Sequence, residues 1–224
     1  MKPKLSREVM AMRIAREFKD GDVVNVGLGL GSIVSNFIPP GTAVTFHAEN
    51  GVIGYGHVLT LGESHLMDYY LTNAGIQFVA PLPGMCFCDI AEAFDAIRTG
   101  RVDVTVLGAL QVSERGDLAN WTTDPQGGWG TIGGAMDMPV GVKRVIVGME
   151  HLDRQGRPKI VKRCSLPLTA PECVDLIVTE LAVIEVTPHG LLLKEIAPGW
   201  TVPEVQAMTE PALMVAAGLK EIGV

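Results

Sequence analysis

The clearest fold signal in the chain is the stretch Val23-Val24-Asn25-Val26-Gly27-Leu28-Gly29-Leu30-Gly31-Ser32. Its valine-rich start predicts a strand, because β-branched residues favour extended backbone. The alternating glycines predict a tight loop, after which Ser32 can cap a short helix that Pro39-Pro40 ends. A strand, a glycine loop and a helix in this order are typical of α/β proteins.

Elements of the same kind lie on both sides of this unit. Met10, Ile14 and Phe18 recur at four-residue intervals and predict an amphipathic helix that Asp20-Gly21-Asp22 ends. Further strands are predicted over residues 43–46, 102–107, 145–147, 174–186 (with a turn at 179–180) and 191–196. Further helices are predicted over residues 89–100, where Asp89 and Glu92 match a capping box, and from Thr201 onward.

The composition indicates one folded domain. With 224 residues, 47% of them hydrophobic and 19% charged, the chain can bury one large core, and we expect a single domain over residues 1–224. The 26 glycines and 14 prolines are consistent with many tight turns. A net charge of −7 without a cluster of Lys and Arg argues against nucleic-acid binding.

The sequence shows no signal for secretion, for a membrane span or for a metal site. Residues 1–8 lack the apolar run of a signal peptide, and no later run is long enough to cross a membrane, so we expect a cytoplasmic protein. Cys86, Cys88, Cys164 and Cys173 lack the spacing of a disulfide framework or a zinc site, and we expect buried, reduced thiols. The five histidines are scattered, so no metal is expected.

Glu49 follows the strand predicted over residues 43–46. That strand leads into His47-Ala48-Glu49-Asn50-Gly51, and ligands of open α/β sheets bind at the carboxyl ends of strands. Asn50 and Gly51 suit a tight turn, because both residues tolerate positive φ. They either contact a ligand or only shape the loop.

The glycine loop raises the alternative of an oxidoreductase that binds a nicotinamide dinucleotide. Gly27, Gly29 and Gly31 lie between a strand and a helix, and Glu49 follows Gly29 by 20 residues, where such sites hold an acid for the ribose. However, Ser32 occupies the position of the third glycine in that fingerprint. A simpler alternative is that the glycines only turn the chain tightly.

Three longer motifs favour a different function. They are HAENGVIGYG at residues 47–56, GALQVSERGDLANW at residues 108–121 and GGAMDM at residues 133–138. Together they resemble the signatures of the B-type subunits of family I coenzyme A transferases, which include 3-oxoacid, 3-oxoadipate and acetate/acetoacetate CoA transferases. The similarity continues through residues 149–151, 164–169 and 195–199, so it covers nearly the whole chain from the first helix onward.

The resemblance implies a fold, substrates and a partner. The expected fold is α/β with an open, mostly parallel sheet and flanking helices, of the NagB/RpiA/CoA transferase-like type. Coenzyme A and acyl-CoA would be substrates together with small carboxylic acids, most simply a 3-oxoacid acceptor, and no cofactor would be bound permanently. The A-type subunit of a CoA transferase would complete the active site in a heterodimer or an α2β2 heterotetramer.

The resemblance also implies roles for individual residues. The family's catalytic glutamate, in its ENG motif, maps onto Glu49, and its oxyanion-hole glycine maps onto Gly134. The residues that the resemblance places at the coenzyme A and substrate site are Gly27, Gly29, Gly31, Asn50, Gly51 and Gly133. We interpret four polar or aromatic residues of the second motif as a hydrogen-bonded turn packed beneath the site: Gln111, Asp117, Asn120 and Trp121.

These residue types suit a transfer of coenzyme A. A carboxylate is ionised at neutral pH and attacks a thioester without a partner base, so Glu49 would form an acyl anhydride and then a glutamyl-CoA thioester. One rival function is an acyl-CoA thioester hydrolase, in which water intercepts the intermediate. Another rival is a non-catalytic subunit that binds acyl-CoA, against which the retained Glu49 argues.

Three positions depart from the family pattern. One is His57, where the glycine motif after Glu49 commonly continues to proline. Many relatives carry a lysine where this chain has Ile76, and another just before the GGAMD motif, near Gly130. Two potential contacts to coenzyme A phosphates or to a substrate carboxylate are therefore missing. The sequence leaves the identity of the two acids open.

Overall fold

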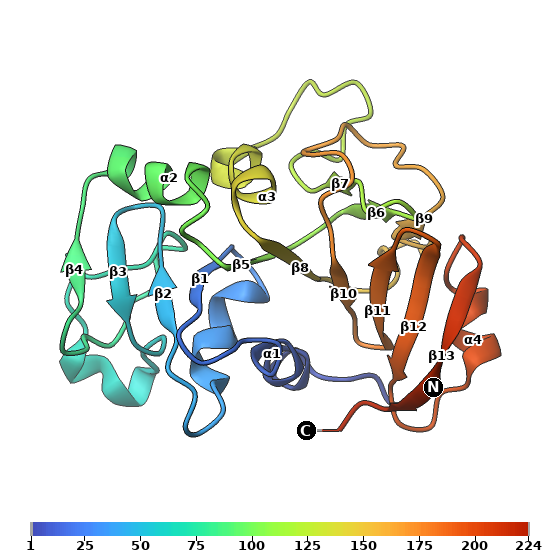
Figure 1. Cartoon of the computed structure of the whole chain (residues 1–224), viewed down its shortest axis with the longest axis horizontal. Coiled ribbons are helices and arrows are strands. Elements are labelled where there is room, and N and C mark those ends of the chain that lie inside the picture. The colour runs from blue at the N-terminus through green and yellow to red at the C-terminus, as the bar shows by residue number, and fades with distance from the viewer. Residues whose placement is uncertain (1, 224) are drawn as a thin grey trace.

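One ten-stranded sheet runs through the computed structural model, which describes residues 2–223 (Figure 1). Its strands follow the order β13-β12-β11-β10-β8-β5-β1-β2-β3-β4. Their bounds are β1 (Val23–Val26), β2 (Thr45–His47), β3 (Val52–Tyr55), β4 (Cys86–Phe87), β5 (Val104–Leu107), β8 (Arg144–Gly148), β10 (Leu176–Val178), β11 (Ala182–Thr187), β12 (Gly190–Ile196) and β13 (Leu213–Glu221). A small sheet of β7 (Leu118–Ala119), β6 (Gln111–Ser113) and β9 (Ile160–Val161) lies beside it.

The centre of the large sheet is parallel. Strands β10, β8, β5, β1 and β2 pair in parallel, whereas β3 and β4 on one side and β11 and β12 on the other pair antiparallel. The prediction of an open α/β sheet is therefore confirmed. Because β1, β2 and β5 are parallel neighbours, their carboxyl ends lie at one edge of the sheet.

Helices cover both faces of this sheet (Figure 1). They are α1 (Arg7–Ala15), α2 (Ile90–Arg98), α3 (Met138–Gly141), α4 (Val202–Ala207) and the 3₁₀ helices η1 (Gly31–Phe37), η2 (Leu61–Leu66) and η3 (Gly133–Met136). Side chains of α1 pack with Val104, Val106 and Ile146 in one core. Side chains of α2 and α3 pack with Val145 and Val147 in a second core. Alternate residues of the parallel strands thus point to opposite faces of the sheet, and each face is buried under helices.

Local signals placed the starts of α2 and α4 correctly. Asp89 and Glu92 form the predicted capping box at α2, and Thr201 begins α4 with a second one. Helix α1 ends at Ala15, earlier than the apolar spacing to Phe18 suggests. The reason is a tightened last turn, in which the Phe18 N–H donates to Ala15 O at 3.3 Å. Phe18 nevertheless stays buried.

Ser32 does not cap the helix that follows the glycine loop. Its hydroxyl donates to Gly29 O at 2.8 Å, and Leu30 stands at the N-cap position without a side-chain cap. The segment folds as a 3₁₀ helix, η1, instead of an α-helix. The serine therefore stabilises the loop itself.

The cysteines are free, but not all of them are buried. Cys86 is exposed on β4, the edge strand, and the other three are only half-buried. The prediction of buried thiols is therefore wrong for Cys86 and met only in part for Cys88, Cys164 and Cys173. Burial raises the pKa of Cys164 to about 11 and that of Cys173 to about 12. Both thiols are therefore protonated and unreactive at neutral pH.

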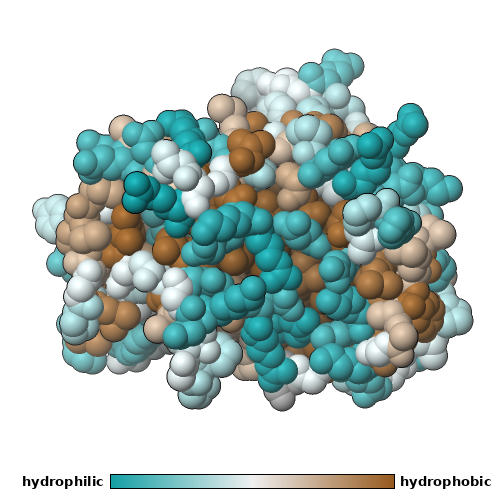
Figure 2. Space-filling model, viewed as in Figure 1, coloured by the Kyte–Doolittle hydropathy of each residue, from teal (hydrophilic) through white to brown (hydrophobic). Residues whose placement is uncertain are grey.

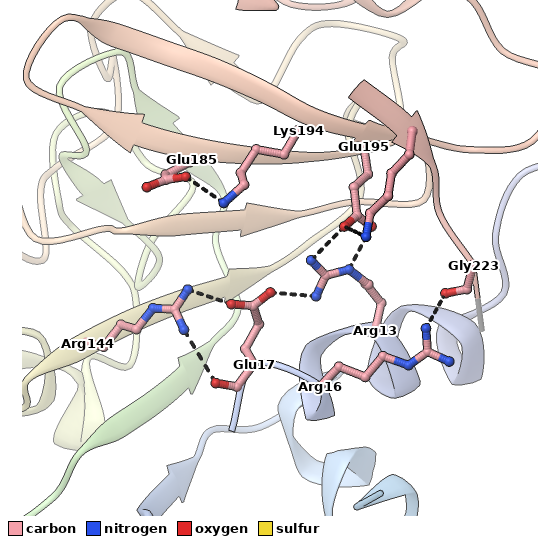
Figure 3. Close-up of polar contacts among 9 residues, drawn as sticks. Arg13, Arg16, Glu17, Arg144, Glu185, Lys194, Glu195 and Gly223 are labelled. Atoms are coloured by element: carbon pink, nitrogen blue, oxygen red, sulfur yellow. Dashed lines mark hydrogen bonds and ion pairs between the residues drawn. The ribbon is translucent and has the colours of Figure 1, made fainter. Parts of the chain in front are cut away.

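A buried ion network joins α1 to the sheet (Figure 3). Arg13 on α1 contacts Glu17 at 2.6 Å and Glu195 on β12 at 2.8 Å, and Glu17 also contacts Arg144 on β8 at 2.6 Å. Burial alone would raise the pKa of Glu17, but the hydrogen bonds from Arg144 and Arg13 hold it below its ordinary value.

The ion network and neighbouring residues line a hollow of about 310 Å³. Its lining residues are Arg13, Arg16, Glu17, Glu195, Lys220, Glu221 and Gly223. On the face drawn in Figure 2, a hydrophilic band crosses the region of α1. Its three basic lining residues are matched in number by three acidic ones, so the hollow has no excess positive charge for an anion.

Over residues 2–223, no helix combines the length and the apolar composition needed to cross a membrane. Over the same residues, no three side chains of His, Cys, Asp or Glu are grouped so that they could hold a metal ion.

Candidate active site

Glu49 lies on a tight turn between β2 and β3. The Gly51 N–H donates to Ala48 O, and the Ala48 N–H donates to Val52 O, both at 2.9 Å. Gly51 has φ +98°, and a Cβ atom there would overlap the carbonyl oxygen of Cys88. Only glycine fits this position, because both the backbone conformation and the space exclude a side chain. The Glu49 side chain is half-buried at the carboxyl edge of the sheet.

A row of buried polar residues crosses three strands directly beneath Glu49. Thr105 on β5, Asn25 on β1 and His47 on β2 are register partners, and each is at most 1% exposed. The Thr105 hydroxyl donates to Asn25 Oδ1 at 3.2 Å, and Asn25 Nδ2 donates to Glu49 Oε2 at 3.2 Å. Asn25 Nδ2 also lies 3.2 Å from His47 O and 3.4 Å from His47 Nδ1.

The hydrogen bonds of His47 define its tautomer. Nε2 lies 3.1 Å from the carbonyl oxygen of Ala93 on α2, and a carbonyl can only accept, so Nε2 carries the proton. Nδ1 is then an acceptor that faces the Asn25 amide. Burial lowers the pKa of His47, so the ring is neutral at neutral pH.

Tyr55 lies on β3, next to the Glu49 turn. Its ring packs against Phe46 with a centroid separation of 5.6 Å, and the residue is 1% exposed. Burial raises the pKa of Tyr55, and the charge of Glu49 adds to the effect. The hydroxyl has no hydrogen-bond partner within residues 2–223.

Gly134 lies in η3 and connects to the Glu49 region through packed side chains. A Cβ atom at Gly134 would lie 2.8 Å from Met138 Cε and 3.0 Å from Phe94 Cζ. Met138 Sδ in turn lies 3.9 Å from the Thr105 hydroxyl, which bonds Asn25. Gly133 precedes it with φ +53° and open space around its Cα. The glycine at 134 is therefore needed for packing as well as for any role in catalysis.

The glycine loop lies on the end of β5. The Gly27 N–H donates to Val106 O at 2.8 Å, and a Cβ atom at Gly31 would lie only 2.8 Å from the same oxygen. Gly29 has φ +90° and faces open space. A Cβ atom at Gly27 would also be tight, at 3.2 Å from Val106 O, so Gly27 and Gly31 have a steric reason to be glycine, whereas Gly29 leaves its backbone accessible.

Residues 72–77 connect the Glu49 turn to the glycine loop. Asn50 Nδ2 donates to Thr72 O at 2.8 Å, and a Cβ atom at Gly75 would lie 3.1 Å from Leu28 Cδ2. The Asn50 side chain therefore has a structural partner. Ile76, at the position where many relatives carry lysine, is 84% exposed and has φ 59°, an unusual conformation for a β-branched residue.

The polar residues of the 108–121 motif hold two loops together. Asn120 donates to Gly108 O at 3.2 Å, and Trp121 Nε1 donates to Leu168 O at 3.4 Å. Gln111 accepts from Ser165 N at 2.8 Å, and Asp117 accepts from Glu172 N at 3.0 Å. These bonds agree with the predicted hydrogen bonding of the motif, whereas its position beneath the site stays a prediction.

Sequence reasoning missed Asn25, Thr105 and His47 as parts of the site. Asn25 and Thr105 lie in predicted strands and His47 directly follows one, but the register that brings them together pairs residues up to 80 positions apart. The available signal was Asn25, an amide inside an otherwise all-valine strand, because a buried amide needs hydrogen-bond partners.

Known proteins resemble this chain over nearly its whole length. The family model described as Coenzyme A transferase matches residues 7–208. A protein of Bacillus subtilis (strain 168), named as the beta subunit of a probable coenzyme A transferase, is 46% identical over 209 residues, which are 93% of this chain and 94% of the relative. The B subunit of the 3-oxoadipate CoA-transferase of Acinetobacter baylyi is 39% identical over 95% of this chain and 97% of its own length.

Solved structures agree on the fold. The apoenzyme of the acyl-CoA transferase YdiF from Escherichia coli O157:H7 has a TM-score of 0.74 at 20% identity and covers 99% of this chain and 44% of its own. The decarboxylase AibA/AibB has a TM-score of 0.71, also at 20% identity, over 99% of this chain and 90% of its own. At such identity the fold alone is shared, since one fold hosts different reactions. The family model and the relatives at 39–46% identity decide between a transferase and a decarboxylase. They show that the chain belongs to the coenzyme A transferase family, among the relatives named as B or beta subunits.

Proposed function

We propose that the chain is the catalytic subunit of a coenzyme A transferase that moves coenzyme A from an acyl-CoA to a carboxylic acid through a thioester on Glu49. The observation that carries the proposal is the placement of Glu49. Its carboxylate stands half-buried at the carboxyl edge of the sheet, on a turn that only glycine at position 51 allows, and a fully buried amide holds one of its oxygens. A nucleophile in this position needs orientation more than activation.

The first half of the reaction loads coenzyme A onto the protein. A Glu49 oxygen attacks the thioester carbonyl, the carbon–sulfur bond breaks, and the thiolate of coenzyme A leaves an acyl-glutamyl anhydride. The thiolate then attacks the glutamyl carbonyl, the carbon–oxygen bond to the donor acid breaks, and the acid departs with one oxygen of the former carboxylate. The product is a glutamyl-CoA thioester.

The second half reverses these steps with the acceptor acid. Its carboxylate attacks the glutamyl thioester, coenzyme A leaves as thiolate and re-attacks the acceptor's acyl carbon, and Glu49 is released as carboxylate. One thioester replaces another, so the overall reaction needs no external energy source. Each tetrahedral intermediate carries negative charge on oxygen, for which Gly134 is the proposed backbone N–H donor, worth roughly 3 to 4 kcal/mol.

The proposed binding surface for coenzyme A consists of the glycine loop and the Glu49 turn. Gly29 offers a backbone without a side chain in open space, while Gly27 and Gly31 fix the loop on β5. Gly133, next to the proposed oxyanion donor, and Gly51, in the turn of the nucleophile, complete the proposed binding surface. Asn50 contributes indirectly, because its side chain holds the Glu49 turn to residue Thr72.

The proposed acceptor is a 3-oxoacid. Support comes from the names of relatives, which include 3-oxoadipate CoA-transferase and, in mouse, succinyl-CoA:3-ketoacid coenzyme A transferase 2A, 43% identical over 96% of this chain. The beta subunit of the acetate CoA-transferase of Escherichia coli is 42% identical, so a simple short acid is the nearest rival. Exposed, apolar Ile76 at the rim argues against a second carboxylate on the acid at that point.

A partner of the A type is proposed to close the site. Relatives at 94–97% coverage of their own length are named as B or beta subunits. Large apolar side chains also stand exposed on the segments that carry or flank the site: Leu28 70%, Tyr69 87%, Tyr70 93%, Ile76 84%, Phe87 65%, Ile90 63% and Trp129 87%. Exposed apolar surface of this kind is typical of a protein interface.

Mass spectrometry tests the proposal directly. The two-subunit complex, incubated with an acyl-CoA and no acceptor, should gain the mass of coenzyme A on the peptide that contains Glu49, and borohydride should remove the adduct. Glu49→Gln should form no adduct and lose transfer by several orders of magnitude, whereas Glu114→Gln, which removes an exposed acid, serves as the matched control. Transfer at wild-type speed by Glu49→Gln would end the proposal.

The same preparation separates the rival functions. A hydrolase would release free acid from acyl-CoA at a rate that an acceptor acid does not redirect. An oxidoreductase would bind NAD(H), which calorimetry detects. A panel of donor and acceptor acids then identifies the pair that reacts fastest.

A further inference from the structure

Helix α2 contacts both the Glu49 turn and the segment that carries Gly134. His47 Nε2, at the end of the strand that leads to the turn, donates to Ala93 O on this helix at 3.1 Å. The next residue, Phe94, lies so close to Gly134 that a Cβ atom there would be 3.0 Å from its ring. One helix therefore touches the support of the nucleophile and the proposed oxyanion donor.

An ion pair at the end of α2 holds the Gly134 segment as well. Arg98 Nε donates to Asp137 Oδ1 at 2.8 Å. Asp137 is the third residue after Gly134, and its own N–H donates to Gly134 O at 3.1 Å. The Arg98 guanidinium also lies 5.4 Å from the centroid of the Phe94 ring, within the range of a cation–π contact. Arg98 therefore reaches the glycine by two routes, through Asp137 and through the ring.

The chain after Asp137 is firmly packed. Met138 is 2% exposed, and a Cβ atom at Gly141 would lie 2.6 Å from Ile97 O. Helices α2 and α3 therefore lie in close contact on one face of the sheet (Figure 1). Asp137 stands at the N-terminal end of this packed unit.

The chain before Asp137 has fewer restraints. Residues 127–134 include five glycines, and Trp129 among them is 87% exposed. For residues 131–137, the bond from Arg98 to Asp137 is the only hydrogen bond of a side chain that the described part of the chain, residues 2–223, provides. A glycine-rich segment has many backbone conformations available, so the place of Gly134 depends on where Asp137 is fixed.

Stability alone does not explain this ion pair. The side chains of Arg98 and Asp137 are 53% and 23% exposed, and solvent-exposed pairs contribute little to the free energy of unfolding. Catalytic geometry, in contrast, is sensitive to displacements of about 1 Å. A bond of this strength can therefore matter more for the position of Gly134 than for the stability of the fold.

We propose that Arg98 and Asp137 are positioning residues that fix the backbone N–H of Gly134 relative to Glu49. The inference rests on the proposed function, in which Glu49 attacks and Gly134 stabilises the oxyanion, and it adds the part that sets the distance between them. Both side chains act through Gly134. Because α2 is bonded to both segments, nucleophile and donor share one frame before substrate binds, as a preorganised donor requires.

The experiment measures how fast Glu49 is loaded in a single turnover. The two-subunit complex is mixed with acyl-CoA in the absence of an acceptor and quenched at intervals, and the glutamyl-CoA adduct is quantified by intact-protein mass spectrometry. Arg98→Met should lower the loading rate at saturating acyl-CoA by about 10- to 100-fold, the range expected when a catalytic group is misplaced by about 1 Å. The acyl-CoA concentration that gives half of the maximal rate should change by less than about 2-fold, because the lost interaction acts in the transition state.

Paired variants and a matched control sharpen the test. Asp137→Leu should cause a loss of similar size, and the double variant should lose no more than either single one, because the two residues act as a unit. Arg98→Lys should keep more of the rate than Arg98→Met, since an ammonium can still pair with Asp137. The control is Arg157→Met, which removes an ion pair with Asp153 of 2.6 Å whose side chains are 74% and 25% exposed, and which should leave loading unchanged.

A merely structural role makes a different forecast, namely lower stability with unchanged loading. Urea unfolding of each variant, expected at the midpoint of the wild type, separates the two roles. Loading at the wild-type rate in Arg98→Met, or an equal loss in Arg157→Met, would overturn the inference. If neither Arg98→Met nor Asp137→Leu folds, the pair is needed for the fold itself and the inference is also overturned. If only one of them folds, its loading rate decides.

The result also distinguishes this inference from the proposed function. Absence of an adduct on wild-type Glu49 would overturn both. An adduct that forms equally fast in the wild type and in Arg98→Met would overturn the positioning role alone and leave the transfer reaction standing.

Discussion

Replacing Arg13 by methionine should lower the free energy of unfolding by about 3–5 kcal/mol, the usual cost of removing one partner from a buried ion pair. Arg13 and Glu195 have side chains only 9% and 7% exposed. The guanidinium donates to both carboxylate oxygens, at 2.8 Å from Nε and 3.1 Å from Nη2 (Figure 3). Without it, Glu195 keeps Lys220 at 3.5 Å, a partner whose side chain is 70% exposed.

Urea unfolding followed by circular dichroism measures this change. The matched control is Lys143→Met, because Lys143 bonds Asp103 at 2.5 Å with a side chain that is 63% exposed. Solvent weakens such a pair, so the control should change the free energy by no more than about 1 kcal/mol. The double variant Arg13→Met with Glu195→Met should recover much of the loss, since it leaves no unpaired buried carboxylate. Equal effects of Arg13→Met and Lys143→Met would refute the reasoning.

Single residues give three further predictions. Gly51→Ala should prevent adduct formation on Glu49, visible by mass spectrometry, because its Cβ overlaps Cys88 O at a φ of +98°. Burial lowers the pKa of His151 to about 4, so the folded state resists protonation. Stability should therefore fall by up to about 3 kcal/mol as pH drops from about 6.5 toward 4, and His151→Gln should flatten that dependence in urea titrations. Tyr55→Phe removes a buried hydroxyl that lacks a partner within residues 2–223, so thermal unfolding should show a change below about 1 kcal/mol.

The parts of the fold that sequence reasoning predicted are those with local causes. The capping box of Asp89 and Glu92 begins α2 because both partners lie within one helical turn. Strand β13 was not predicted, since its sequence shows no alternation of apolar and polar residues and its exposure follows none. Its parallel pairing with β12 depends on tertiary packing.

The residues of the candidate site likewise divide into those with local causes and those that depend on strand order. Glu49 could be placed from the sequence because strand, turn and glycine follow one another along the chain. The support from Asn25 could not, because it requires that β1 lie between β2 and β5 and that Thr105, Asn25 and His47 share one register. No local pattern encodes strand order, so buried polar residues of this kind are recognised only once the sheet is assembled.

The turn that bears the nucleophile is anchored to its neighbour β4 through main-chain atoms. The Cys88 N–H donates to Gly51 O at 2.9 Å, and Cys86 pairs with Ile53 in the ladder. Main-chain bonds of this kind do not depend on which side chains β4 exposes to solvent. The exposed thiol of Cys86 is consequently a ready attachment point for a fluorescent label, from which loading of Glu49 can be watched in real time without engineering a new cysteine.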